Sequence, residues 1–138
     1  MNKLFSIDPI WPESGLAFIR IVVGIFMILH GAEIFNEETM RSYLTWMSSP
    51  LYMIYFGKAA ELIAGIMLAL GFLTRLASVV LILTMLYISV FVGKGRIWYE
   101  DQHPFMFVLL GLVFFFLGPG RFSVDWLLNR RKADRSAK

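Results

Sequence analysis

The stretch LYMIYFGKAAELIAGIMLALGFL, residues 51–73, is apolar along its whole length except for Lys58 and Glu61. At a rise of about 1.5 Å per residue, these roughly 23 residues form a helix long enough to cross a hydrocarbon core of about 30 Å. Charged side chains inside a bilayer are costly, so they face a bundle interior, find partners there and often mark function. Lys58 and Glu61 share one helical sector with Gly65 and Leu68. We therefore expect this face to look into a helical bundle.

The composition excludes an ordinary soluble domain. Of the 138 residues, 58% are hydrophobic and 17% are charged, which is too few charges to cover a soluble domain of this size. The sequence contains no cysteine, which excludes disulfides, thiolate metal sites and a thiol redox relay on this chain. Residues 1–14 carry one lysine and no apolar core, so we expect an interfacial segment anchored by Trp11 rather than a cleavable signal peptide.

Hydropathy predicts an all-α integral membrane four-helix bundle with short interfacial helices, formed by a single domain of residues 1–138. The connection at residues 36–50 predicts a short amphipathic helix that lies on the membrane and is capped by Asn36. The sequence of residues 123–131 predicts another interfacial helix. The turn between the second and third spans is very short, so these two helices are expected to be antiparallel neighbours. The four spans are expected at about residues 15–35, 51–73, 76–92 and 102–120.

The fourth span is short if it begins at Pro104, because a helix from Pro104 to Leu117 reaches only about 21 Å. Two alternatives make up the difference. Either residues 118–122 complete the crossing, or the acidic residues 100–103 enter the bilayer, which is compatible with Pro104 at the first helical position.

The distribution of lysine and arginine predicts the orientation of the chain. With four spans both termini lie on one side, which holds eight lysine and arginine residues outside the spans, whereas the other side holds three. The positive-inside rule then places both termini in the cytoplasm and the protein in the bacterial cytoplasmic (inner) membrane. Because the C-terminal basic cluster lies next to a span, we expect it to contact anionic lipid headgroups and expect no nucleic-acid partner. This cluster consists of Arg130, Arg131, Lys132, Arg135 and Lys138.

The topology gathers charged residues from distant parts of the sequence. Arg20, Lys58 and Glu61 are expected to form a buried polar centre, with Arg20 reaching toward Glu61. Together with Glu33 they would make an ion-pair network that fixes the register of the helices.

The same topology also predicts a polar pocket that opens toward the outer leaflet. Such a pocket could hydrogen-bond the carbonyl of a quinone or a lipid headgroup, with Phe, Met and Leu as its apolar wall. Its two histidines are proton donors or acceptors near neutral pH, although each also fits an ordinary interfacial residue. The candidate pocket residues are His30, Glu33, Glu100, Asp101 and His103.

Two short motifs bear on metal binding. His30 and Glu33 form H-x-x-E, and Glu100 and His103 form E-x-x-H, which is one ligand pattern of di-iron bundles. The remaining carboxylates are too few and are expected to pair with basic residues. We therefore expect no metal site.

The order of several motifs resembles the DoxX family over about residues 15–125. The resemblance implies a four-helix membrane protein, and some members of the family resemble subunits of membrane oxidoreductases, including the thiosulfate:quinone type, or of redox-stress complexes. The motifs that carry the resemblance are Arg20, Gly24, His30 and Gly31, then Glu61, Gly65, Gly71, Thr74 and Arg75, and finally G-P-G-R-F-S-V-D at residues 118–125.

This chain departs from the family pattern at one place. Many relatives carry a lysine shortly after the H-G pair, where this sequence has Glu33, Ile34 and Phe35. Lys58 on the neighbouring helix is expected to take the place of that lysine.

Two classes of function fit these observations. The first is the membrane subunit of a quinone-linked oxidoreductase or redox-stress system, with a membrane quinone as cofactor, a redox protein as partner, and homo-oligomerisation left open. The second is a non-catalytic membrane scaffold or chaperone-like protein whose buried charges set helix packing. A small transporter or proton relay ranks last, because no span is broken in the middle as transporter helices often are.

Overall fold

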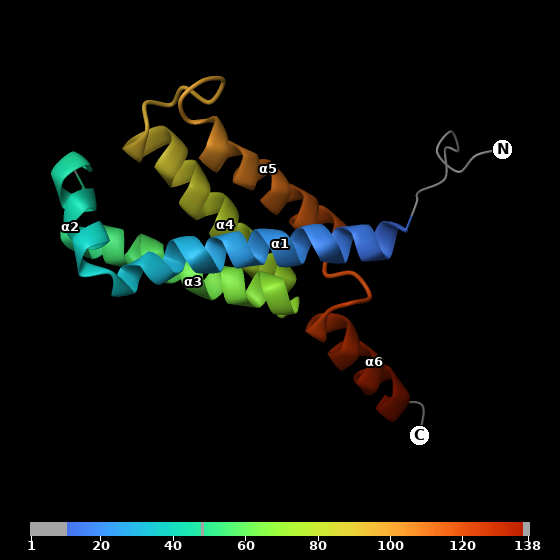
Figure 1. Ribbon diagram of the computed structural model, residues 1–138. Coiled ribbons are helices and arrows are strands. Elements are labelled where there is room, and N and C mark those ends of the chain that lie inside the picture. The colour runs from blue at the N-terminus through green and yellow to red at the C-terminus, as the bar shows by residue number, and fades with distance from the viewer. Residues whose placement is uncertain (1–10, 48, 137–138) are drawn as a thin grey trace.

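The computed structural model describes residues 11–47 and 49–136, in which all regular structure is helical and no strand occurs. The all-α fold predicted from the sequence is therefore confirmed (Figure 1). Most of the interfacial segment predicted for residues 1–14 lies outside the described residues. The helices are α1 (Pro12–Ala32) with the 3-10 turn η2 (Glu33–Phe35), α2 (Glu37–Trp46), α3 (Leu51–Leu70), α4 (Thr74–Tyr87) with the π-helical turn η3 (Ile88–Val92), α5 (Gln102–Leu117) and α6 (Val124–Ser136).

Three helical segments of the described chain are long and apolar enough to cross a membrane, namely Pro12–Phe35, Leu51–Leu70 and Thr74–Val92. The predicted fourth span corresponds to α5, which has 16 residues and is therefore about 24 Å long. It ends at Leu117 because Gly118 has φ 78° and Pro119 follows, so the helix does not continue toward residue 120. These helices identify the chain as a membrane protein.

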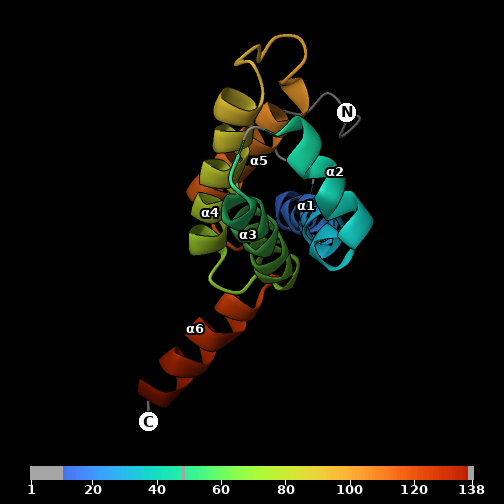
Figure 2. The ribbon, with the colours of Figure 1, turned by 90° about the vertical axis from the view of Figure 1, so that its left-hand side faces the viewer.

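The four apolar helices pack in the order α1, α3, α4, α5 around one core. Figure 2, which faces the end of the molecule that carries α2, shows α3 between α1 and α4. Each helix contributes to the core, as Met27, Leu68, Leu81 and Phe114 show, all fully buried. Large apolar side chains also cover the outer faces of these helices. This arrangement suits a bundle whose surrounding solvent is lipid.

Glycines let α1 and α3 come close together. A Cβ atom on Gly65 would lie 2.7 Å from the backbone nitrogen of Ile28, and one on Gly24 would lie 2.6 Å from that of Ala69. Real side chains do not tolerate such distances to backbone atoms, so only glycine permits this approach. The contact packs the C-terminal half of α1 against the C-terminal half of α3.

The other end of α1 is held by the turn at residues 118–122. Arg20 is fully buried, and its guanidinium donates hydrogen bonds to the carbonyl oxygens of Pro119 (3.0 Å) and Phe122 (2.6 Å). The turn can present these carbonyls because Gly118 and Gly120 have positive φ values of 78° and 70°. Arg20 therefore joins α1 to the chain that follows α5.

Asp125 joins the start of α6 to the turn between α3 and α4. Its carboxylate accepts hydrogen bonds from the backbone nitrogens of Leu73 (2.8 Å) and Thr74 (2.9 Å), and its own nitrogen donates to the Gly71 carbonyl (3.0 Å). These contacts cap the start of α4, where backbone donors have no partner within the helix. The residues of the G-P-G-R-F-S-V-D element thus have structural roles, while α6 projects away from the bundle (Figure 1).

We predict that Gly65→Ala lowers the stability of the bundle by about 1–3 kcal/mol, because the new methyl group forces α1 and α3 apart. Gly57→Ala is the matched control, since a Cβ atom there meets nothing within 4 Å. It should raise the stability slightly, because alanine is a better helix former than glycine. Thermal unfolding of both variants in mild detergent checks this, and equal melting temperatures would contradict the close packing.

We predict that Asp125→Ala lowers the free energy of unfolding by about 0.5–2 kcal/mol, because the start of α4 loses its cap. Asp134→Ala, an exposed change on the same helix, should leave stability nearly unchanged. Limited proteolysis should also cut the Asp125→Ala protein faster between the bundle and α6. Identical unfolding and cleavage of the two variants would show that the cap carries no stability.

Candidate functional site

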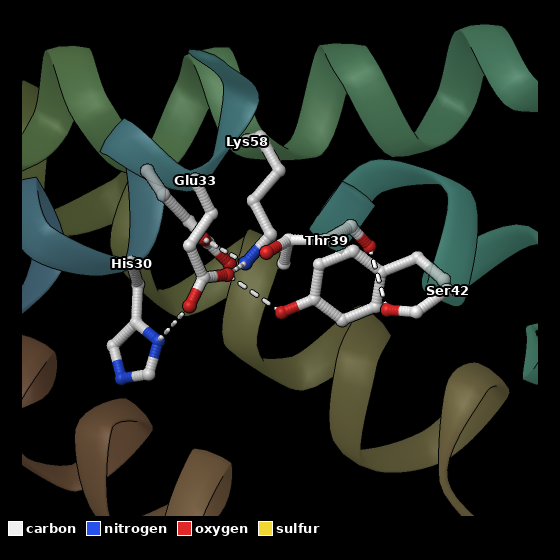
Figure 3. A network of polar contacts seen from close by, with 7 residues as sticks. His30, Glu33, Thr39, Ser42 and Lys58 are labelled. Carbon is white, nitrogen blue, oxygen red and sulfur yellow. Dashed lines mark hydrogen bonds and ion pairs between the residues drawn. The ribbon is translucent and has the colours of Figure 1, made fainter. Parts of the chain in front are cut away.

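Lys58 is the centre of a buried polar cluster at the α2 end of the bundle (Figure 3). Its Nζ atom lies 2.8 Å from Glu33 Oε2 and 3.1 Å from Glu61 Oε2. The side chains of Lys58 and Glu61 are only 12% and 3% exposed. Glu61 is one helical turn after Lys58 on α3, whereas Glu33 comes from η2 at the end of α1. The Lys58 ammonium group thus ties η2 at the end of α1 to α3 through Glu33, while its pair with Glu61 lies within α3.

Tyr43 extends this cluster to α2 and was missed as a site residue by sequence reasoning. Its hydroxyl donates a hydrogen bond to Glu33 Oε2 (2.6 Å), and Lys58 Nζ lies 4.9 Å from the centre of its ring. Burial, and the hydrogen bond to the Glu33 carboxylate, raise the pKa of Tyr43, so the phenol keeps its proton at neutral pH. The sequence did offer a signal for Tyr43, namely a tyrosine on an otherwise apolar helix face. When such a face is buried, the tyrosine hydroxyl needs a polar partner nearby.

The two histidines meet beside this cluster, although they are far apart in the sequence. His30 lies on α1 and His103 on α5, and the centres of their rings are 6.2 Å apart. His30 Nδ1 lies 3.9 Å from Glu33 Oε1, and the ring of His103 packs edge to face with Phe107 at 5.3 Å. The cluster of Lys58 and its carboxylates is therefore continued by two imidazoles.

A cavity of about 250 Å³ adjoins these groups, and Glu33 is not among the residues that line it. Such a combination of an apolar wall and a few convergent polar groups is typical of sites for small organic molecules. Among the polar residues that line it are His30, Tyr43, Lys58, Glu61 and His103, and the apolar ones include Met53, Ile54, Met85, Ile88 and Phe107.

The structure corrects the expected position of Arg20. Within the described residues Arg20 forms no ion pair with Glu61, and its hydrogen bonds instead reach Pro119 and Phe122 at the opposite end of α1. The cause is that helical side chains lean toward the N-terminus of their own helix, so Arg20 extends away from Glu61. The structure therefore brings Glu33, Lys58 and Glu61 together and places the Arg20 guanidinium away from them.

Glu100 and Asp101 are not brought to the cavity either. Glu100 pairs with Lys94 (3.3 Å) and Arg96 (3.2 Å) on the surface. The Asp101 carboxylate accepts hydrogen bonds from the backbone nitrogens of Lys94 (3.0 Å) and Arg96 (2.8 Å) and closes that loop. Because α5 begins only at Gln102, Glu100 and His103 do not share a helical face. In the described chain no three His, Asp or Glu residues are grouped to hold a metal ion.

Comparison with known proteins finds similarity to several bacterial proteins. An "Uncharacterized protein" of Haemophilus influenzae is 31% identical, over 91% of this chain and 96% of its own length. An uncharacterized membrane protein of Mycobacterium tuberculosis is 26% identical, over 91% and 93%. The Bacillus subtilis protein named "Putative oxidoreductase CatD" is 32% identical over 62% of this chain and 60% of its own.

No solved structure matches the chain. The model of the DoxX family, however, matches residues 15–94, which contain α1 to α4 and most of the cavity residues. With this match, its helical membrane architecture and its similarity to a relative along nearly the whole length, the chain belongs to the DoxX family.

Proposed function

We propose that this protein is the membrane subunit of a quinone-linked redox system and that its cavity binds the head of an isoprenoid quinone. The observation that carries the proposal is the meeting of His30 and His103 beside the Lys58 cluster, inside a cavity with apolar walls. The name of the Bacillus subtilis relative points to the same class of activity.

The residues present fit a quinone head. An imidazole N–H of His30 or His103 can donate a hydrogen bond to a quinone carbonyl, while Met53, Met85 and Phe107 pack on the ring. A volume of about 250 Å³ suits one ring rather than a whole long-chain ligand. When bound, a quinone supplies two-electron, two-proton redox chemistry.

The net charge of the Lys58 cluster favours the binding of protons. Glu33 and Glu61 contribute two carboxylates and Lys58 contributes one ammonium group, so one negative charge is left over when all three are ionised. In a low-dielectric interior this excess charge attracts a proton or a cation into the cavity. An imidazole can accept a proton at one ring nitrogen and donate one from the other, so His30 and His103 can pass protons between this cluster and the ligand. The electrons would come from a redox partner protein.

We place the protein in the bacterial cytoplasmic membrane, as a single four-span domain with both termini in the cytoplasm. Arg121 donates a backbone hydrogen bond to Glu13 (2.9 Å), so the start of α1 and the start of α6 lie at one end of the bundle. Arg75 in the first turn of α4 and the basic residues of α6 belong to this end. The positive-inside rule assigns such an end to the cytoplasm.

A second function is favoured by the complete pairing of Lys58. Because two carboxylates already satisfy its ammonium group, the cluster could serve only to fix the packing of α1, α2 and α3. The protein would then be a non-catalytic membrane scaffold. The two functions differ in whether the cavity holds a ligand.

We predict that protein purified in mild detergent retains isoprenoid quinone at close to one molecule per chain, and that His30→Ala and His103→Ala lose most of it. Glu100→Gln is the control, because Glu100 pairs with Lys94 and Arg96 outside the cavity. Mass spectrometry of organic extracts measures the quinone, and thermal unfolding checks that each variant folds. Quinone at the level of an unrelated membrane protein would favour the scaffold.

We predict that Lys58→Met costs about 3–5 kcal/mol of stability, because it leaves two buried carboxylates without their partner. Combining it with Glu33→Gln and Glu61→Gln should restore much of the loss, since no buried charge remains. Lys94→Met, which removes an exposed ion pair, should change stability by about 1 kcal/mol or less. Unfolding in detergent compares these variants, and a Lys58→Met protein as stable as the control would contradict the proposed ion-pair cluster.

A further inference from the structure

One side of the bundle is open where the others are closed. The pairs α1 and α3, α3 and α4, and α4 and α5 are in direct contact, whereas α1 and α5 face each other across a groove of about 300 Å³. Its walls include Ile19, Val22 and Phe26 on α1 and Met106, Phe107 and Leu110 on α5. The groove therefore separates the first helix of the bundle from the last.

The side chains explain why this side stays open. Gly24 and Gly65 allow α1 to approach α3, and Gly111 allows α5 to approach α4, since a Cβ atom there would lie 2.7 Å from Ile82 Cγ1. Between α1 and α5 the facing positions carry large rings instead, including Phe26 and Phe107. Bulky side chains in place of glycine keep two helices apart.

The groove lies between the cavity and the outer surface of the bundle. His103 and Phe107 line both spaces, so the groove and the cavity adjoin at these residues. Along the groove Ile19 on α1 and Met106 on α5 are exposed, at 45% and 59%. Apart from His103, every residue that lines the groove is apolar. It is thus suited to a hydrocarbon chain and offers little to a polar solute.

We infer that the ligand reaches the cavity sideways from the bilayer, between α1 and α5, and that its isoprenoid tail lies in this groove while its head lies beside His30 and His103. This inference rests on the proposed function and narrows the ligand to prenylated quinones. The cavity holds about 250 Å³ and cannot enclose a long tail, so the tail must leave it. The groove is the apolar space that shares His103 and Phe107 with the cavity.

The test narrows the groove without touching the polar cluster. Ile19→Trp and Met106→Trp add bulk from the two walls at exposed positions, where a larger side chain does not disturb the core. Ile21→Trp and Leu109→Trp are matched controls on the same two helices, because both positions are exposed, at 40% and 50%, and line neither the groove nor the cavity. Thermal unfolding confirms that all four variants fold.

Each delipidated variant is titrated with a prenylated benzoquinone and with the same ring bearing no tail. We expect Ile19→Trp and Met106→Trp to weaken binding of the prenylated quinone about tenfold, as overpacking of a filled groove does. Binding of the tail-free quinone, and of both ligands to the controls, should stay unchanged. Unchanged binding of the prenylated quinone, or equal weakening of both ligands, would overturn the inference.

A photoreactive group at the end of the tail gives a second readout that needs no variant. Labelling of peptides from α1 and α5 supports the groove, and labelling confined to the outer faces of α3 or α4 refutes it. If phospholipid occupies the groove and prenylated quinone does not displace it, an acyl chain is the occupant and the inference fails. If wild-type protein binds neither quinone, the proposed function itself fails.

Discussion

The packing of this membrane protein depends on the pairing of one buried ammonium group. Lys58 lies in an apolar span, where an unpaired charge would cost several kcal/mol, so α1 and α3 must bring Glu33 and Glu61 to it. The Tyr43 hydroxyl donates a further hydrogen bond to the Glu33 carboxylate, and this contact holds α2 against the same end of the bundle. A single buried charge thus determines how three helices meet.

A second group of polar contacts, made by Arg20 and Asp125, holds the opposite end of the bundle. Neither group of contacts closes the side between α1 and α5. Arg20 is bound to the carbonyls of Pro119 and Phe122, and Asp125 caps α4, so the chain after α5 is tied to α1 and to the turn between α3 and α4. Between these two ends the glycines close the contacts among neighbouring helices. No comparable polar or glycine contact is present between the middle parts of α1 and α5 within the described residues, and the groove lies there.

The chemistry of the site follows from this architecture more than from membership of the DoxX family, because related folds carry different functions. The pairing of Lys58 explains how α1, α2 and α3 pack, but it does not account for two histidines that converge on an apolar cavity. A ligand with a polar head and an apolar body would use both parts. Redox function and scaffold function are therefore separable, since only the first needs that cavity to be filled.

The sequence by itself determined the helices, their approximate bounds and the cap at Asn36, because these depend on periodicity and on residues a few positions apart. It also indicated that Lys58 and Glu61 face inward. Only the tertiary structure decided that Arg20 turns away from Glu61, that Asp101 closes a loop instead of lining the cavity, and that α1 and α5 stay apart. Those features depend on side-chain direction and on contacts between residues distant in the chain, for which helical spacing carries no information.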